Sequence, residues 1–317
     1  MSVGAIIIGR NEGDRLIRGL AALGEDVSPV IYVDSGSDDG SVAAAEAAGA
    51  QVVLLDTDRP FTAARARNAG IQALVAQTPP PDLVQFIDGD CELRAGWIET
   101  ATGFLADHPK VAAVCGRRRE RFPEASVYNR LIDLEWDTPC GETRACGGDV
   151  LMRLSALRQV GGYNPDLIAG EEPELCVRLR KAGWQIWRLE AEMTWHDAAL
   201  TRFSQWWKRA RRAGHAYAEG AALHGAPPER HNVAQTRRAL IWGMALPLAV
   251  AAGVLVTPWA LPLVLLWPLQ WGRLTQRSGD PVQALFLTLS KTPEALGVLE
   301  FHMHRLRGRK AALIEYK

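Results

Sequence analysis

Short apolar runs alternate with helix-like segments along residues 1–115 of this 317-residue chain. Such runs are typical of buried strands, and the segments between them have apolar residues at the spacing of an amphipathic helix. Strands that alternate with helices in this way form a parallel sheet covered by helices. The predicted class is therefore α/β, with a mostly parallel, Rossmann-like sheet. The apolar runs are 3–8, 30–33, 52–55, 83–87 and 111–114, and the helix-like segments are 14–23, 41–48, 65–75 and 96–106.

Polar residues follow three of these strands at the point where each strand ends. The three segments are 9–12, 34–41 and 88–90. Ligands of open α/β sheets bind at the carboxyl ends of the strands, so we expect the three segments to line one cleft. Segment 34–41 also has the residues of a strand-to-helix turn, with an N-cap at Asp39 or Ser41.

Two carboxylates, Asp88 and Asp90, lie one residue apart after the apolar run 83–87. Carboxylate oxygens at the end of a buried strand suit a hard divalent cation that also binds substrate phosphates. An ordinary turn is the alternative, because Asp and Gly are common turn residues. The pattern points to nucleotide-sugar chemistry, provided that the rest of the chain agrees.

Charge and cysteine content exclude several classes of protein. Lysine plus arginine and aspartate plus glutamate both number 36, so no basic excess indicates nucleic acid as a partner. The five cysteines show neither metal-ligand spacing nor a disulfide framework, which favours a reducing, cytosolic compartment. With 48% hydrophobic residues, the chain can form one large domain plus an appendage.

Several motifs, in the same order and at similar spacing, resemble those of the family 2 glycosyltransferases. Members of that family have a GT-A fold and invert the anomeric centre of a nucleotide-sugar donor. The match covers about residues 1–215. The motifs are 33–41, 66–70, 88–90, 147–153 and 161–163.

The resemblance implies a role for each motif. Asp34 and Asp88 would contact the nucleoside, and Asp90 would hold Mg2+ or Mn2+ on the diphosphate, with Asp88 and His196 as further ligands. For His196, the alternative is a packed, hydrogen-bonded residue beside Trp195. The other donor-binding candidates are Arg10, Asn11, Glu12, Arg67 and Asn68, and the acceptor-binding candidates are Gly148 and Asp149.

Segment 170–175 departs from the family pattern Gly-Glu-Asp-x-Asp-Leu, because it has Glu172 where the family has the catalytic Asp. A glutamate can still take a proton from an acceptor hydroxyl if its pKa and reach suit the task. The resemblance therefore implies Glu172 as the catalytic base, with Glu171 as the second candidate. A helix start is the alternative, since Pro173 and the acidic residues suit a first turn.

A basic aromatic segment follows at residues 202–212. Its arginines would neutralise a leaving diphosphate and its tryptophans would stack on a sugar, as in a closing active-site loop. A basic helix attracted to anionic lipid headgroups is the alternative. By contrast, the run 117–119 is predicted to be a solvated loop. The candidates are Arg209 and Arg212 for the donor and Trp206 and Trp207 for the acceptor.

Residues 239–272 contain no ionisable side chain, and arginines flank them on both sides. The stretch is long for one membrane crossing and short for two. Positive charge at both ends favours a re-entrant or shallow hairpin with both ends on the cytoplasmic side. A buried helical pair in a soluble protein is the alternative. An amphipathic segment at 281–299 and a basic tail at 302–310 also indicate contact with membrane lipids.

These features predict a metal-dependent, inverting glycosyltransferase on the cytoplasmic face of an inner membrane. The expected donor is a UDP-sugar, and the expected acceptor is a polyprenyl-linked or saccharide hydroxyl in surface polysaccharide synthesis, with other assembly enzymes as partners. The alternatives are a polyprenyl-phosphate sugar synthase, a sugar nucleotidyltransferase, a processive polymer synthase and a non-catalytic membrane scaffold. The expected domains are 1–215 (donor half about 1–115, acceptor half about 116–215), a basic linker 216–238, and a membrane-associated region 239–317.

Overall fold

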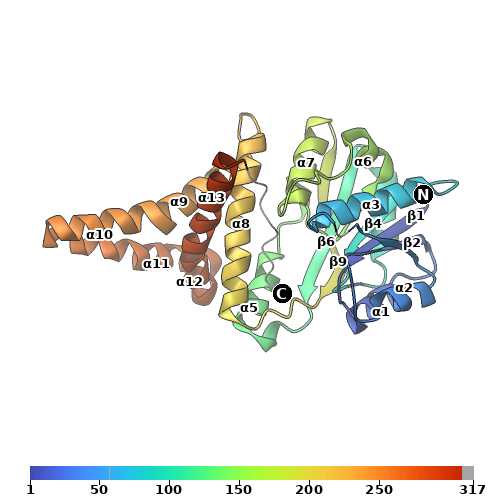
Figure 1. Ribbon diagram of the computed structural model, residues 1–317, viewed down its shortest axis with the longest axis horizontal. Helices are drawn as coiled ribbons and strands as arrows, with labels where there is room; N and C mark the ends of the chain where they lie inside the picture. Colours follow the sequence, from blue (N-terminus) through green and yellow to red (C-terminus); the bar gives the residue numbers. More distant parts are fainter. Residues whose placement is uncertain (57, 309–317) are drawn as a thin grey trace. The chain divides into compact units, whose positions relative to one another are not determined.

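The computed structural model describes residues 1–56 and 58–308. Arg309 and Lys310 of the predicted basic tail lie outside the described residues. The chain divides into two compact units, Met1–Thr201 and Arg202–Lys317. The first unit is an α/β domain, and the second is helical (Figure 1).

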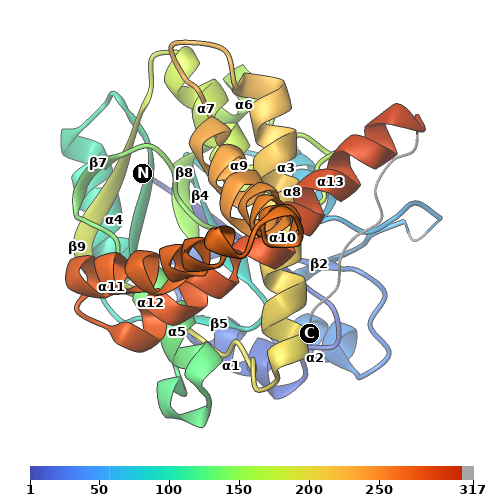
Figure 2. The ribbon, with the colours of Figure 1, turned by 90° about the vertical axis from the view of Figure 1, so that its left-hand side faces the viewer.

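A mixed sheet forms the centre of the first unit. Its strands run in the order β3-β2-β1-β4-β8-β6-β9-β5, and β7 pairs with β9. The β1–β2, β1–β4, β2–β3 and β6–β9 pairs are parallel, whereas β5, β7 and β8 enter antiparallel to their neighbours. Figure 2 shows β8 beside β4. The strands are β1 Val3–Gly9, β2 Val27–Asp34, β3 Gln51–Leu54, β4 Leu83–Asp88, β5 Cys91–Leu93, β6 Val111–Glu120, β7 Gly141–Thr143, β8 Val150–Arg153 and β9 Gln185–His196.

The predicted α/β class is confirmed, and the predicted elements of residues 1–115 correspond to observed ones within a few residues. Strands β5, β7 and β8 were not predicted, because three or four residues are too few to show a periodic pattern. These short strands make the sheet mixed. The helices are α1 Asp14–Ala21, α2 Ser41–Ala47, α3 Ala63–Val75, α4 Trp97–Asp107, η1 Pro123–Ala125, α5 Val127–Glu135, α6 Leu154–Val160 and α7 Glu171–Lys181.

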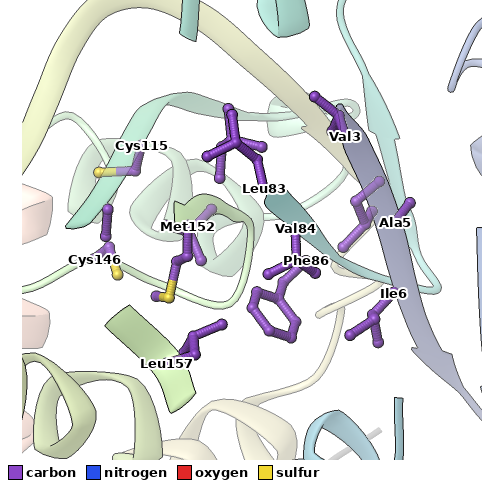
Figure 3. Packing of buried hydrophobic residues seen from close by; sticks show 14 of the residues in the cluster. Val3, Ala5, Ile6, Leu83, Val84, Phe86, Cys115, Cys146, Met152 and Leu157 are labelled. Carbon is purple, nitrogen blue, oxygen red and sulfur yellow. The ribbon is translucent and has the colours of Figure 1, made fainter. Parts of the chain in front are cut away.

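The core of the first unit lies along β1 and β4. Every residue of β1 is buried, as expected for a central strand with both faces covered. Figure 3 shows Ile6 of β1 and Phe86 of β4 among these buried side chains. Gly70 lets α3 approach β1 closely, because a Cβ at position 70 would lie 2.5 Å from Cγ2 of Ile6. Each fully buried large aliphatic side chain contributes about 1.5–3 kcal/mol of hydrophobic stabilisation.

Helices make up the described part of the second unit. The long helix α8 packs along α13, where Gly214 lies against the backbone of Glu294 and leaves no room for a side chain. The predicted domain boundary at residue 215 falls inside α8, and the two units divide at Thr201. The elements are α8 Phe203–His224, α9 Val233–Leu240, η2 Ile241–Ala245, α10 Leu246–Val256, η3 Pro258–Leu265, α11 Leu266–Ser278, α12 Pro281–Leu289 and α13 Lys291–Leu306.

Helices α9 and α10 continue through the π-helical turn η2, and η3 packs against α10 before the chain runs on into α11 (Figure 1). Within the described residues, the helical stretch Val233–Val256 is long and apolar enough to cross a membrane. The uncharged residues 239–272 thus form a helical hairpin, with its turn at Thr257.

Candidate active site

Three strand ends lie side by side at one edge of the sheet. Strand pairing aligns Gly9 of β1 with Asp34 of β2, and Ile8 of β1 with Asp88 of β4. The polar segments that follow these strands therefore begin at the same level of the sheet, as the sequence predicts. This edge is where open α/β sheets bind their ligands.

The loop after β2 is built around the buried carboxylate of Asp34. Its Oδ2 accepts hydrogen bonds from the backbone N–H groups of Gly36 and Ser37, both at 2.8 Å. Asn11 ties this loop to the end of β1, because its N–H donates to Ser37 Oγ at 2.9 Å and its Oδ1 accepts from the N–H of Asp38 at 2.9 Å. The turn at Asp34 is thus rigidly held, and contact of Asp34 and Asn11 with a donor stays a prediction.

Arg67 of α3 is buried among carboxylates. Its guanidinium lies 2.9 Å from Asp88, 3.0 Å from Glu171 and 2.8 Å from Glu172. Gly148 packs against this junction, since a Cβ at position 148 would lie 2.6 Å from Nη2 of Arg67 and 2.9 Å from Oδ2 of Asp88. Arg67 therefore joins the end of β4 to the two predicted catalytic glutamates, and a side chain at position 148 would displace the Arg67 and Asp88 groups.

Glu172 has the ionisation expected of a general base. Burial, and then the negative charge of Glu171, raise the pKa of the Glu172 carboxyl to about 7, while Arg67 opposes the rise. A general base works best when its pKa lies near the operating pH. Helix α7 begins at these two glutamates, so the helix-start interpretation and the catalytic interpretation are compatible.

Asp90 faces β9, where it meets His196. Oδ2 of Asp90 lies 3.4 Å from Nε2 of His196, whose Nδ1 lies 3.3 Å from Oε2 of Glu120. Burial, and then the charge of Arg118, lower the pKa of His196, so the ring stays neutral, which is its metal-binding form. A carboxylate on the other ring nitrogen orients an imidazole that binds metal. Glu120 has the geometry for this role, although the sequence analysis did not identify it.

Arg118 was predicted to lie in a solvated loop, and this prediction is wrong. It belongs to β6, which continues to Glu120 because residues 117–120 pair with β9. Its guanidinium lies 3.2 Å from Oδ2 of Asp88 and 3.4 Å from Oδ2 of Asp149, and it stacks over Trp136 at 4.6 Å. Arg118 thus neutralises two carboxylates of the site, and it contacts Oδ2 of Asp88 while Arg67 contacts Oδ1.

Two further motif residues, Asp149 and Asn68, form hydrogen bonds that connect different elements of the site. Asp149 is fully buried, and its Oδ1 accepts from the N–H of Asp88 at 3.0 Å while its Oδ2 accepts from Oγ1 of Thr194 at 2.8 Å. Asn68 bonds the backbone of Tyr163 twice, donating to its carbonyl at 2.7 Å and accepting from its N–H at 2.9 Å. These bonds give both side chains structural partners, and their binding roles stay predictions.

The remaining candidates lie on other elements. Arg10 and Glu12 are in the loop after β1, where Glu12 pairs with Arg15 at 2.9 Å. The basic aromatic segment belongs to α8 of the second unit, where Trp206 packs edge-on against Phe286 at 5.0 Å. The predicted contacts of α8 with donor and acceptor stay predictions; they concern Trp206, Trp207, Arg209 and Arg212.

Two groups of described side chains have the chemistry of metal ligands. The first is Asp90, Cys91 and His196, and the second is Asp88, Cys91 and Asp149. The guanidinium of Arg118 lies within the second group, with Nη2 3.2 Å from Asp88 and 3.1 Å from Sγ of Cys91. Burial raises the pKa of the Cys91 thiol well above its usual value, so this thiol stays protonated. Asp90 and His196 supply an oxygen and a neutral nitrogen, which fit Mn2+ or Mg2+ with further oxygens from a diphosphate and water.

Comparison with known proteins relates the first unit to one family. Residues 5–152 match the family model of glycosyl transferase family 2. The N-terminal domain belongs to this family. Pre-mycofactocin glycosyltransferases from two strains of Mycobacterium tuberculosis are 28% identical to this chain over 176 residues. The alignment covers 50% of the chain and 36% of each relative, so the chain spans about a third of the length of the curated relatives it matches.

Solved structures share the fold of this protein. The mannosyltransferase PcManGT from Pyrobaculum calidifontis, in complex with GDP-Man and Mn2+, has a TM-score of 0.66 at 20% identity, covering 94% of this chain and 87% of its own. The glucosyl-3-phosphoglycerate synthase of M. tuberculosis has a TM-score of 0.50 at 19% identity, covering 71% and 81%. At these identities the similarity shows the GT-A type of α/β fold.

Proposed function

We propose that the first unit transfers a sugar from a nucleotide-sugar, specifically a UDP-sugar, to an acceptor hydroxyl with inversion at the anomeric carbon. The observation that carries this proposal is the Arg67 junction, which brings Glu172, with a pKa of about 7, next to Asp88 at the end of β4. Membership of glycosyltransferase family 2 supports it. Among the proteins of similar fold, PcManGT is solved with GDP-Man and glucosyl-3-phosphoglycerate synthase with UDP.

The proposed step uses one carboxylate as a base and two arginines as counter-charges. The acceptor oxygen forms its bond to the anomeric carbon while the bond from that carbon to the diphosphate breaks, and Glu172 takes the hydroxyl proton. Arg67 holds Glu172 beside the donor end of the sheet. Arg67 and Arg118 also offset the negative charge that builds on the departing diphosphate.

A divalent ion, Mg2+ or Mn2+, completes the proposed site. Asp90 and His196 would hold it, and Glu120 would fix the orientation of the imidazole. When bound, such an ion neutralises the diphosphate and so favours its departure. The Mn2+ in the PcManGT complex supports this proposal.

A polyprenyl-linked or saccharide hydroxyl in surface polysaccharide synthesis is the proposed acceptor. The uncharged helical hairpin of residues 239–272 supports a lipid-borne acceptor and a location on the cytoplasmic face of a membrane, where other assembly enzymes would be partners. The same hairpin would also serve a polyprenyl-phosphate sugar synthase, which attacks with a phosphate oxygen and needs no hydroxyl-deprotonating base. Loss of activity in a Glu172→Gln variant separates the two, because only the hydroxyl acceptor requires this carboxylate.

Thermal unfolding in the presence of nucleotides tests the donor class. We expect UDP with Mn2+, but not GDP or CMP, to raise the Tm of the full chain, since ligand binding to the folded state raises apparent stability. The rise should vanish in Asp90→Ala. It should persist in Asp107→Ala, the matched control, because Asp107 is exposed at the end of α4. Stabilisation by GDP alone would reject the UDP assignment, and stabilisation by no nucleotide would favour the scaffold.

A further inference from the structure

The second unit carries a helical hairpin whose side chains are almost all apolar. We call residues 241–272 the apolar hairpin; its first arm is η2 and α10, its second arm is η3 and most of α11, and none of its side chains is ionisable. The two arms meet near the turn, where α10 packs against η3, and Figure 2 shows α11 diverging from α10 beyond it. The arms touch through small residues near the turn, where a Cβ at Gly253 would lie 3.0 Å from Cβ of Ala260.

Large apolar side chains cover the outside of the apolar hairpin. Leu255, Val256 and Trp259 at its turn are 86–89% exposed. Further along the arms, Leu248 and Leu269 are more than 60% exposed. Across an apolar 18-residue part of the helical stretch Val233–Val256, 11% of the residues are buried. An apolar surface that extends along two helices and around their turn marks an interaction site, unlike scattered exposed leucines.

Backbone N–H groups at the turn of the apolar hairpin donate hydrogen bonds within the protein, as they must in a medium without water. The N–H of Thr257 donates to the carbonyl of Gly253 at 2.8 Å, and the N–H of Ala260 donates to the carbonyl of Thr257 at 3.1 Å. The N–H of Trp259 donates to Oγ1 of Thr257 at 3.4 Å. Position 258 is proline and has no N–H. Each unpaired backbone group in hydrocarbon costs several kcal/mol, so this hydrogen bonding suits a turn in lipid.

The flanking charges and the length of the apolar hairpin match the dimensions of a lipid bilayer. Arginines 237 and 238 precede the first arm, and Arg273 and Arg277 follow the second, so exposed positive charge lies at the base of each arm. The uncharged helix from Ala239 to the turn is about 27 Å long at 1.5 Å per residue, close to the roughly 30 Å of a bilayer's hydrocarbon core. Because the chain turns back at Thr257, both open ends emerge on the same side.

We propose that the apolar hairpin inserts into an anionic lipid bilayer from one side as a re-entrant hairpin, with its four flanking arginines among the headgroups. Anionic lipid is favoured over a second copy of the chain because the flanking charges are all positive in this region and would repel their equivalents in a partner. The inference rests on the second unit alone, so it stands or falls independently of the proposed sugar transfer.

Vesicle flotation of the purified full chain tests the insertion. We expect binding to phosphatidylcholine vesicles to strengthen at least tenfold when about a third of the lipid is phosphatidylglycerol, since each basic residue near an anionic surface adds to the attraction. A double variant, Leu255→Asp with Val256→Asp, should weaken binding at least 100-fold, because acidic residues are strongly disfavoured in hydrocarbon. Leu54→Asp is the matched control and should bind as wild type, since Leu54 is 70% exposed on β3 of the first unit.

Thiol labelling tests whether both ends of the apolar hairpin lie on the same side of the bilayer, and it does not depend on the folding of the double variant. Cys140 is the exposed cysteine of the described residues, so Cys140→Ser provides the background. On vesicles, Val256→Cys should resist a membrane-impermeant maleimide, whereas Gln235→Cys and Gln276→Cys, at the two open ends, should both react from outside. Reaction of the two ends from opposite sides overturns the hairpin. Protection of Val256→Cys without any lipid, together with a dimer in solution, overturns the bilayer in favour of a second copy.

Discussion

Replacing Glu172 by glutamine should nearly abolish sugar transfer. A general base contributes about 10²–10⁴-fold to a rate, so Glu172→Gln should lower kcat by that factor. With the pKa of Glu172 at about 7, roughly a tenth of the carboxylate is ionised at pH 6 and roughly nine tenths at pH 8. The wild-type kcat should therefore rise about tenfold across this range. Release of nucleoside diphosphate from the donor, with water as acceptor, provides the assay from pH 5 to 9.

Neighbouring charges should move this pH profile in opposite directions. The negative charge of Glu171 raises the pKa of Glu172 and the positive charge of Arg67 lowers it. Glu171→Gln should therefore shift the acidic limb of kcat to lower pH, and Arg67→Met should shift it to higher pH. A charge at this distance changes a pKa by roughly 1–3 pH units.

Glu172→Asp is the matched control, because it retains a carboxylate and restores the residue of the family pattern. It should keep a titrating profile at reduced rate. The reasoning is refuted if Glu172→Gln keeps wild-type activity, because this carboxylate would then not be the base. If Glu171→Gln is the inactive variant instead, the assignment of Glu172 as the base is wrong and Glu171 is the base.

Other substitutions should separate binding, packing and stability. Asp90→Asn should remove the Mn2+-dependent part of nucleotide binding measured by calorimetry, while binding without metal stays unchanged. Gly148→Ala should lower kcat/KM and Tm together, because its Cβ has no room beside the acid–arginine junction. Arg118→Met should destabilise the fold by about 3–5 kcal/mol in denaturant unfolding, since it leaves the buried Asp149 carboxylate without its cation. Glu172→Gln should raise Tm at pH 8 but not at pH 4, because a carboxyl whose folded-state pKa lies above the usual 4.5 destabilises the fold increasingly as pH rises towards 7.

The sequence pattern predicted the central strands and the residues at their ends. Strand β1 reads as a continuous apolar run because both of its faces are covered, so it could be found without knowledge of its partners. Asp88 follows such a run, and the parallel alignment of strand ends brings it close to Asp34 and the loop after β1. Glu172 and Arg67 came from the order of motifs, and the structure adds that they touch.

Two residues of the site were beyond sequence reasoning. Arg118 belongs to a basic run that reads as solvated, and only the pairing of β6 with β9 turns its side chain onto Asp88 and Asp149. Glu120 meets His196 because the same pairing sets these two residues opposite each other. Neither contact has a signal in local periodicity, since the partners are 30 to 76 residues apart in the chain.

Local pattern therefore determined which segments become buried strands, where the chain turns, and which stretch has no charge at all, because these properties depend on a residue and its near neighbours. Tertiary structure alone decided that Arg67 joins Glu172 to Asp88, and that Asp90 lies next to His196. Burial and the fields of charges from distant segments set the pKa of Glu172. Those quantities exist only once the strands and helices that supply the charges have packed together.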